Sequence, residues 1–120
     1  MANAKTYTGG CHCGDVRYEV TIPLSEVLEC NCSICSKTGS LLAAAPADRF
    51  RLLTDADRLT EYQFGKKRIH HFFCSRCGIR SFSRGTGPDG KEMAAINVRC
   101  LDGVDLSALK VVQFDGLNLL

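Results

Sequence analysis

The sequence predicts an all-β fold in which short strands are held together by metal-binding cysteines. Runs that alternate apolar and polar residues are short and frequent, glycine and proline separate them, and helical periodicity is weak. Cysteine is the outlier of the composition, with 8 of 120 residues, and seven of the eight lie in three tight groups. The length favours a single domain, which we take as residues 1–120.

The first clear strand is expected next to the first cysteine group. Val16, Tyr18 and Val20 alternate with polar residues, which is typical of a half-buried strand. Glycines on both sides of this cysteine group give the backbone the freedom that a metal-binding turn needs. Residues 26–30 then lead into the second cysteine group.

The later elements follow from the same signals. Residues 33–37 predict one helical turn, which Gly39 ends. Residues 41–45 predict a buried strand that Pro46 closes. Further strands are expected at 50–53, 59–64, 68–73, 79–83, 93–98 and 110–114, with a hairpin turn at 65–67, a loop at 84–91 and a second helical turn at 106–109.

The composition excludes several classes of protein. Hydrophobic residues make up 45% and charged residues 23%, which argues against disorder. The formal charge of +2 is spread along the chain, so electrostatics favours neither nucleic acid nor a membrane surface as partner. No apolar run approaches the roughly 20 residues of a membrane helix. The first residues lack the apolar stretch of a signal peptide, so we expect a cytoplasmic protein; the oligomeric state is left open.

The cysteines favour metal binding over two other uses. Disulfides are disfavoured because no export signal is present and bridges between such near neighbours close very short loops. A thioredoxin-like redox site at Cys74 and Cys77 would lie within a βαβ unit, which the sequence does not predict. Short Cys-x-Cys and Cys-x-x-Cys turns offer two thiolates to one ion, and sulfur without carboxylates selects zinc or an iron–sulfur cluster, with zinc more frequent in small ribbon-like folds.

Seven ligands divide naturally into four and three. Two pairs complete a closed structural zinc site: Cys11, Cys13, Cys74 and Cys77. The triplet forms a site with one open position, as a catalytic zinc has: Cys30, Cys32 and Cys35. The triplet can also recruit His12 or Cys100, although His12 is expected to point away from the metal and Cys100 to be a small core residue. His70 and His71 are expected to face opposite sides of a strand, with structural roles as the default for both and a place in a cleft open to one of them.

Three motifs in order resemble the glutathione-dependent formaldehyde-activating family, to which the carboxyl-terminal domain of centromere protein V also belongs. The motifs are Gly-Cys-His-Cys-Gly-Asp-Val-Arg-Tyr at 10–18, Cys-Asn-Cys-Ser-Ile-Cys at 30–35 with Gly39, and Phe-Cys-Ser-Arg-Cys-Gly at 73–78. The resemblance covers a core of residues 8–116. It implies a β-tent of small antiparallel sheets around two zinc ions and the same division of ligands. Ser36 and Ile79 depart from the family pattern, and we expect them to bear on the substrate rather than on the metals.

The resemblance implies a zinc-dependent carbon–sulfur lyase that acts on adducts of glutathione, or a similar thiol, with a small aldehyde. Three thiolates make zinc a weak Lewis acid that suits a soft fourth ligand such as a substrate thiol. Candidates for holding a glutathione carboxylate are His70, His71, Lys37 and Arg68, each of which also fits a solvated surface. Two zinc ions per chain are expected, the triplet ion being the one that purified protein can lack.

Two other functions stay open at this point. One is a zinc-stabilised binding module in which the triplet is structural; one zinc per chain favours it, and two favour the enzyme. The other is methionine sulfoxide reduction with Cys100 as nucleophile, which lacks a resolving cysteine free of metal.

Overall fold

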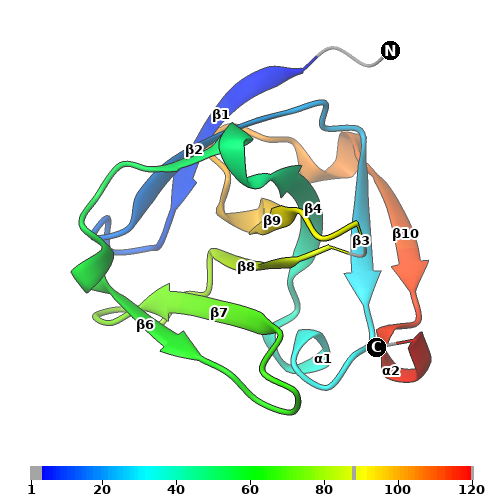
Figure 1. Cartoon of the computed structure of the whole chain (residues 1–120). Helices are drawn as coiled ribbons and strands as arrows, with labels where there is room; N and C mark the ends of the chain where they lie inside the picture. The colour runs from blue at the N-terminus through cyan, green and yellow to red at the C-terminus, as the bar shows by residue number, and fades with distance from the viewer. Residues whose placement is uncertain (1–3, 88, 120) are drawn as a thin grey trace.

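A computed structural model describes residues 4–87 and 89–119 of the chain (Figure 1). The described residues form ten strands and a few short helical turns, so the predicted all-β class is confirmed. The strands are β1 Lys5–Gly10, β2 Arg17–Ile22, β3 Glu26–Cys30, β4 Leu41–Pro46, β5 Phe50–Leu52, β6 Leu59–Tyr62, β7 Ile69–Cys74, β8 Phe82–Thr86, β9 Glu92–Asn97 and β10 Lys110–Phe114. The helical turns are α1 Cys35–Thr38, η1 Ala47–Arg49, η2 Ala56–Arg58, η3 Val98–Cys100, η4 Leu106–Ala108 and α2 Gly116–Leu119.

The strands form two sheets. The smaller has the order β1-β2-β5, and the larger has the order β10-β3-β4-β9-β8-β7-β6. Neighbouring strands pair antiparallel, as expected, except that β10 pairs with β3 in parallel, with Lys110 opposite Glu26. In Figure 1 these two strands run side by side, although one lies early and the other late in the sequence. A hairpin cannot produce a parallel pair, so no local signal predicts it.

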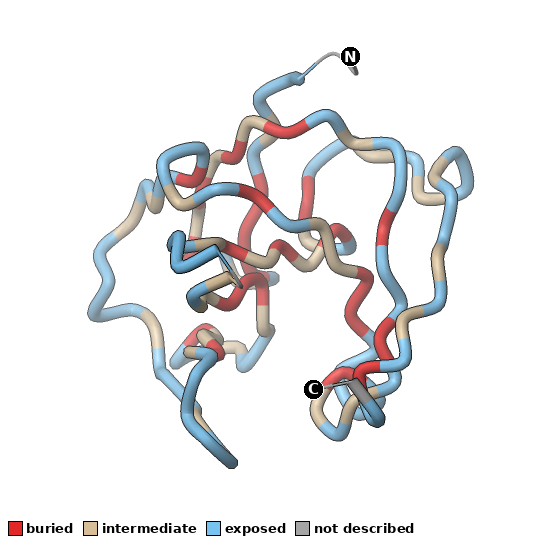
Figure 2. The backbone as a smooth tube through the Cα atoms, turned by 45° about the vertical axis from the view of Figure 1, so that its right-hand side comes forward, coloured by how far each residue is buried: buried red, intermediate tan, exposed pale blue. Residues whose placement is uncertain are grey.

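The core fills the space between the two sheets. Tyr18 of β2 is fully buried, and its ring lies 5.1 Å from that of Phe50. Phe82 of β8 completes the cluster, with its centroid 4.6 Å from Phe50. Every second residue of β2 is buried, which confirms the alternation seen in the sequence. Figure 2 shows the buried segments inside the molecule and exposed loops around them.

Several boundaries differ from those predicted. β1 was not predicted because its first residues are largely exposed and show little alternation. The strand expected at 79–83 begins only at Phe82, because Ile79 instead uses its carbonyl to accept from the Cys74 N–H at 3.1 Å. It runs on to Thr86, inside the expected loop; residue 88 of that loop lies outside the described residues.

The remaining differences are small. The hairpin strands β6 and β7 are confirmed but leave a longer connection at 63–68. α1 begins at Cys35 rather than 33 and ends, as predicted, at Gly39, whose φ is 70°. Within residues 4–87 and 89–119, no helix has the length and apolar character needed to cross a membrane.

Candidate metal centres and the adjoining cavity

Four cysteines from two distant parts of the chain converge at one end of the core. Cys11 and Cys13 follow β1, Cys74 ends β7, and Cys77 lies in the turn after it. Their Sγ atoms all lie within 4.8 Å of one another. The Sγ of Cys13 is 3.6 Å from those of Cys11 and Cys74. A tetrahedral ion bound to sulfur at about 2.3 Å separates its ligands by about 3.8 Å, so this donor set fits zinc.

Backbone N–H groups favour thiolates at part of this cluster, whereas at Cys13 the Asp15 N–H is outweighed by desolvation and the neighbouring cysteines, which raise the pKa to about 12. The N–H of Val16 donates to the Cys11 Sγ at 3.2 Å, and the N–H of Arg76 donates to the Cys74 Sγ at 3.3 Å. Desolvation raises the pKa of Cys77, but backbone N–H groups, first that of Ile79, outweigh it and lower the pKa to about 6. Because thiolates rather than thiols bind metals, the cluster could hold an ion that ties the N-terminal sheet to the larger one.

The second cluster is built by one short segment. Cys30 ends β3, Cys32 lies in the following turn, and Cys35 begins α1. Their Sγ atoms again lie within 4.8 Å of one another, with Cys30 and Cys35 buried and Cys32 half-buried. Burial, followed by the neighbouring Cys32 and Cys30, raises the pKa of Cys35 to about 12, so a dication would relieve the cost of gathering three thiolates here. Three thiolates fit a zinc site with one open position.

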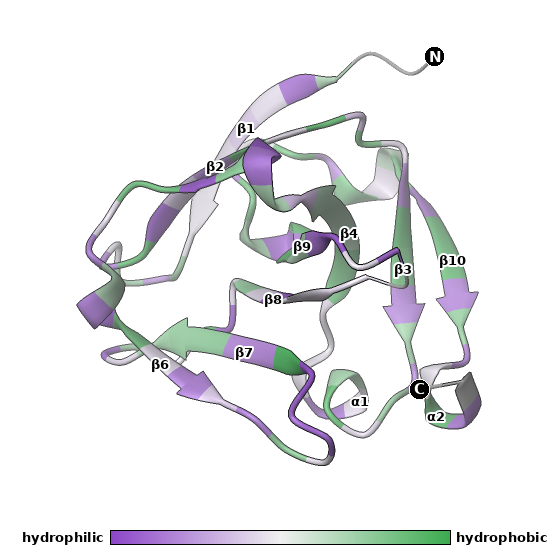
Figure 3. Ribbon diagram, in the orientation of Figure 1, coloured by the Kyte–Doolittle hydropathy of each residue, from purple (hydrophilic) through white to green (hydrophobic). Residues whose placement is uncertain are grey.

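The triplet opens into a cavity of about 740 Å³, and none of the other five cysteines is among the described residues that line it. The cavity floor is one face of the larger sheet, with Leu42 of β4, Ala95 of β9 and Ser83 of β8. Figure 3 shows apolar residues on both β3 and β4, where the floor begins. A substrate bound in this cavity would therefore contact the triplet directly.

Arg80 and His71 supply the polar groups of this cavity. Nη2 of Arg80 lies 3.1 Å from Nδ1 of His71, and Nη1 donates to the Ser40 Oγ at 3.3 Å. Since a guanidinium can only donate, Nδ1 of His71 accepts and the neutral ring carries its proton on Nε2. Burial, the charge of Arg80 and then His70 lower the pKa of His71 to about 4, so the ring is neutral at pH 7. The Arg80 Nε is buried without a hydrogen-bond partner among the described residues.

The other candidate residues fall in different places. His12 and Lys37 are exposed and join neither cluster, and His70 lies 2.8 Å from Glu61 on the surface. Arg68 lines the cavity, and so does His71, which is thus the histidine of the pair that lines a cleft. Cys100 is half-buried beside the core, with its Sγ 3.9 Å from the Arg80 carbonyl oxygen, and joins neither cluster.

Sequence reasoning did not find Arg80, Ser40 or Ser83. Arg80 follows the last cysteine pair by three residues, but nothing in the sequence distinguishes it from the chain's other arginines. Nothing in the sequence separates the buried Ser40 and Ser83 from the chain's exposed serines either.

Comparisons with known proteins agree with this arrangement. A family model described as "Glutathione-dependent formaldehyde-activating enzyme" matches residues 6–113. Among solved structures, a crystal structure of a Rhodobacter sphaeroides protein is similar, with a TM-score of 0.75 and 32% sequence identity. The match covers 88% of this chain and 99% of that chain. The residues matched by the family model include both cysteine clusters and most of the cavity.

Proposed function

Because the chain belongs to the glutathione-dependent formaldehyde-activating family, we propose that it is a carbon–sulfur lyase that makes and breaks adducts of glutathione, or a similar thiol, with an aldehyde. The observation that carries the proposal is that three converging cysteines line a cavity shared with the Arg80–His71 pair. We further propose that Cys11, Cys13, Cys74 and Cys77 hold a structural zinc and that Cys30, Cys32 and Cys35 hold a second one beside the substrate.

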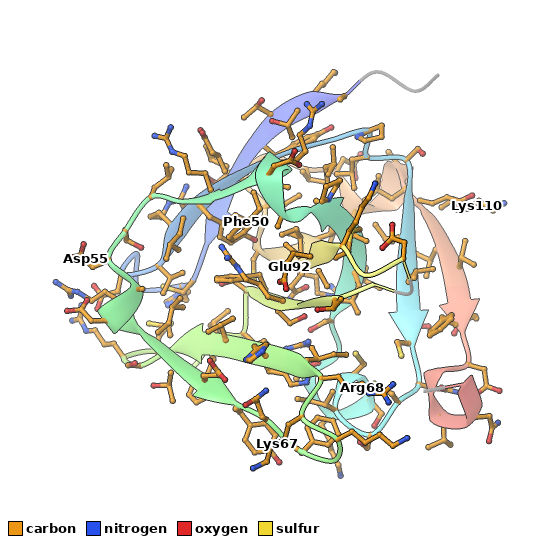
Figure 4. The ribbon with its side chains drawn as sticks, in the orientation of Figure 1. Phe50, Asp55, Lys67, Arg68, Glu92 and Lys110 are labelled. Atoms are coloured by element: carbon orange, nitrogen blue, oxygen red, sulfur yellow. The ribbon has the colours of Figure 1, made fainter. Side chains whose placement is uncertain are left out.

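A zinc ion held by the triplet would keep a substrate thiol in its nucleophilic, deprotonated form. The protein's own groups would act on the other reactant. Nε2–H of neutral His71 is a hydrogen-bond donor available to an aldehyde oxygen, and Arg80 is a fixed positive charge next to it. Arg68, at the end of the 63–68 connection, is placed to attract a glutathione carboxylate (Figure 4).

The proposed reaction involves no oxidation. In the forward direction the sulfur electron pair forms a bond to the aldehyde carbon, the C=O π pair moves to the oxygen, and that oxygen takes up a proton to become a hydroxyl group. In reverse the hydroxyl loses its proton, the C=O bond re-forms, and the C–S pair returns to sulfur. Donors aimed at the oxygen stabilise the charge that develops there in both directions.

The cavity also bears on the alternative of a non-catalytic binding module. A purely structural triplet gains nothing from a hollow at its open side, or from Arg80, which costs free energy to desolvate. The enzyme is therefore the better-supported function. Methionine sulfoxide reduction by Cys100 has no comparable support, since Cys100 does not line this cavity.

The decisive variant is Cys32→Ser, since Cys32 belongs to the triplet alone. We expect a folded protein that binds one zinc instead of two and no longer accelerates the exchange between glutathione, formaldehyde and their adduct, as followed by nuclear magnetic resonance exchange spectroscopy. Cys100→Ser is the matched control, because Cys100 lies in neither cluster, and it should keep both ions and the activity. Wild-type protein with two zinc ions and no rate enhancement would reject the enzyme in favour of the binding module.

A further inference from the structure

The cavity beside the triplet has two chemically different sides. Cross-strand neighbours project from the same face of a sheet, so the floor can be followed strand by strand. Leu28 lies opposite Leu42 on β3 and β4, whereas Ser83 lies opposite His71 on β8 and β7. Ala95 of β9 separates the two pairs and leaves the hollow between them. The floor is therefore apolar toward β3 and mixed toward β7, where Ile69 lines the cavity on the same strand as His71.

Residues outside the floor extend both sides. On the aliphatic side, Phe114 of β10 and Leu117 of α2 also line the cavity. Leu28 is 37% exposed and Leu117 is 64% exposed, so large apolar surface faces the opening. On the side toward β7, the connection before that strand contributes the cations Lys66 and Arg68, together with the exposed apolar side chain of Phe64, and the strand itself contributes the exposed Ile69. Among the described lining residues there is no aspartate or glutamate, so apart from the cysteine thiolates the charges on this side are cationic.

This division matches a substrate with an anionic half and an apolar half joined at a sulfur. Glutathione carries its charges on one side of its thiol and would use the cationic side. A one-carbon aldehyde would leave the aliphatic side empty, although the cavity measures about 740 Å³, which is within the range that holds a drug-sized molecule. Exposed apolar side chains gathered at one opening usually mark a place where an apolar group binds.

We propose, resting on the function proposed above, that the side formed by Leu28, Leu42, Phe114 and Leu117 binds the side chain of an apolar aldehyde. The preferred substrates are then thiol adducts of aldehydes with on the order of four to eight apolar carbons rather than the formaldehyde adduct. The bonds made and broken are unchanged: the C–S pair stays with sulfur, the hydroxyl releases its proton, and the aldehyde leaves.

Turnover tests the proposal directly. Zinc-loaded protein is given the glutathione adducts of formaldehyde and of phenylacetaldehyde, and kcat/KM for cleavage is measured by exchange spectroscopy. Each buried methylene contributes about a fourfold gain in affinity, so partial burial of the phenylacetaldehyde side chain should favour that adduct by at least tenfold. Equal rates, or faster cleavage of the formaldehyde adduct, overturn this proposal and leave the proposed function standing. If neither adduct is cleaved faster than in buffer, the proposed function fails.

Binding provides a readout that does not depend on catalysis. S-hexylglutathione and S-methylglutathione are unreactive, and calorimetry should give the hexyl compound a Kd at least tenfold lower. Equal Kd values reject the aliphatic site whatever the turnover assay gives. A lower Kd for the hexyl compound supports the site even if neither adduct is cleaved.

Two variants test whether the difference in Kd between the two thioethers arises in this cavity. Leu28→Gln should bring the Kd ratio of the two thioethers toward one, because it makes the aliphatic wall polar. Val111→Gln is the matched control: Val111 is 43% exposed on the neighbouring strand β10, does not line the cavity, and should keep the wild-type ratio. A ratio that survives Leu28→Gln, or that falls equally in Val111→Gln, rejects the assignment.

Discussion

The Arg80 guanidinium connects the histidine of one strand to the helical turn that carries the last triplet cysteine. It lies 3.1 Å from Nδ1 of His71 and donates to the Ser40 Oγ at 3.3 Å; that hydroxyl in turn lies 3.0 Å from the Thr38 Oγ1 at the end of α1. One side chain thus fixes the tautomer of His71 and the position of α1 relative to β7.

Arg80→Gln should lower kcat/KM for adduct cleavage by about 100-fold, the usual cost of removing a fixed donor from a developing oxyanion. The cavity wall would lose the positive charge next to His71, while the four-cysteine cluster would keep its zinc. Arg84→Gln serves as the control because the Arg84 guanidinium lies over the Phe50 ring, 5.1 Å from its centroid, and outside this cavity. Equal decreases of kcat/KM in both variants would mean that Arg80 affects activity only through the stability of the fold.

His71 should make the protein less stable in mild acid. Burial, with Arg80 and His70, lowers its pKa from 6.5 to about 4 in the folded state. Between pH 6.5 and pH 4, this histidine is therefore protonated in the unfolded chain and neutral in the folded protein. As a result, the free energy of unfolding decreases by up to about 3 kcal/mol as the pH drops from about 6.5 to about 4.

Urea unfolding at several pH values gives the free energy of unfolding of wild type and of each histidine variant. The comparison uses the difference between wild type and variant at each pH, because the effect of zinc release is common to both and cancels. The free energy of unfolding of His71→Gln should change less than that of wild type over this pH range. The free energy of unfolding of His70→Gln should still decrease in acid as in wild type, because His71 is still present. A His71→Gln profile that parallels wild type would show that the stability loss comes from other groups.

Cys77→Ser should prevent folding. Structural zinc sites contribute apparent binding energies of about 10–16 kcal/mol, which is as large as the net stability of a whole domain. We expect insoluble protein, or a soluble chain without cooperative unfolding by circular dichroism. Soluble Cys77→Ser with an unchanged melting temperature would contradict the assignment of the four-cysteine zinc.

The triplet zinc should leave first when a chelator is added. It has one protein ligand fewer and faces the cavity, whereas the other ion would be enclosed by four cysteines. Chelator titration followed by metal analysis should pass through a folded state with one zinc per chain. Simultaneous loss of both ions, or unfolding at the first loss, would show that the roles of the two sites are wrongly assigned.

Gly10→Ala should destabilise the protein severely because of a backbone clash at the first cysteine group. A Cβ at this position would lie 1.9 Å from the Val16 carbonyl oxygen, which accepts from the Cys11 N–H at 3.0 Å. We expect a loss of more than about 3 kcal/mol in urea unfolding. At Gly85 a Cβ would lie 3.4 Å from its nearest neighbour, the Arg68 carbonyl oxygen, so Gly85→Ala should lower the free energy of unfolding much less.

Elements with local signals could be predicted from the order of residues alone. The alternation around Tyr18 predicts β2, and the helical turn ended by Gly39 depends on neighbouring residues alone. The cysteine pairs and the triplet were also predictable, because Cys-x-Cys and Cys-x-x-Cys turns place two sulfurs together whatever the rest of the chain does. The grouping of Cys11 and Cys13 with Cys74 and Cys77 was inferred from the four ligands of a closed zinc site, and the fold brings the two pairs together. That these clusters hold zinc stays a prediction.

The surroundings of the triplet depend on contacts between strands that are distant in the sequence. The parallel pairing of β10 with β3 brings Phe114 to the cavity, and the pairing of β7 with β8 brings His71 to it. Arg80 meets His71 because the turn after Cys77 folds back across the sheet, a contact between residues nine positions apart on different elements. Such contacts depend on the free energy of packing the whole sheet rather than on any short pattern, so one sequence predicts the metal ligands but not the cavity that would select the substrate.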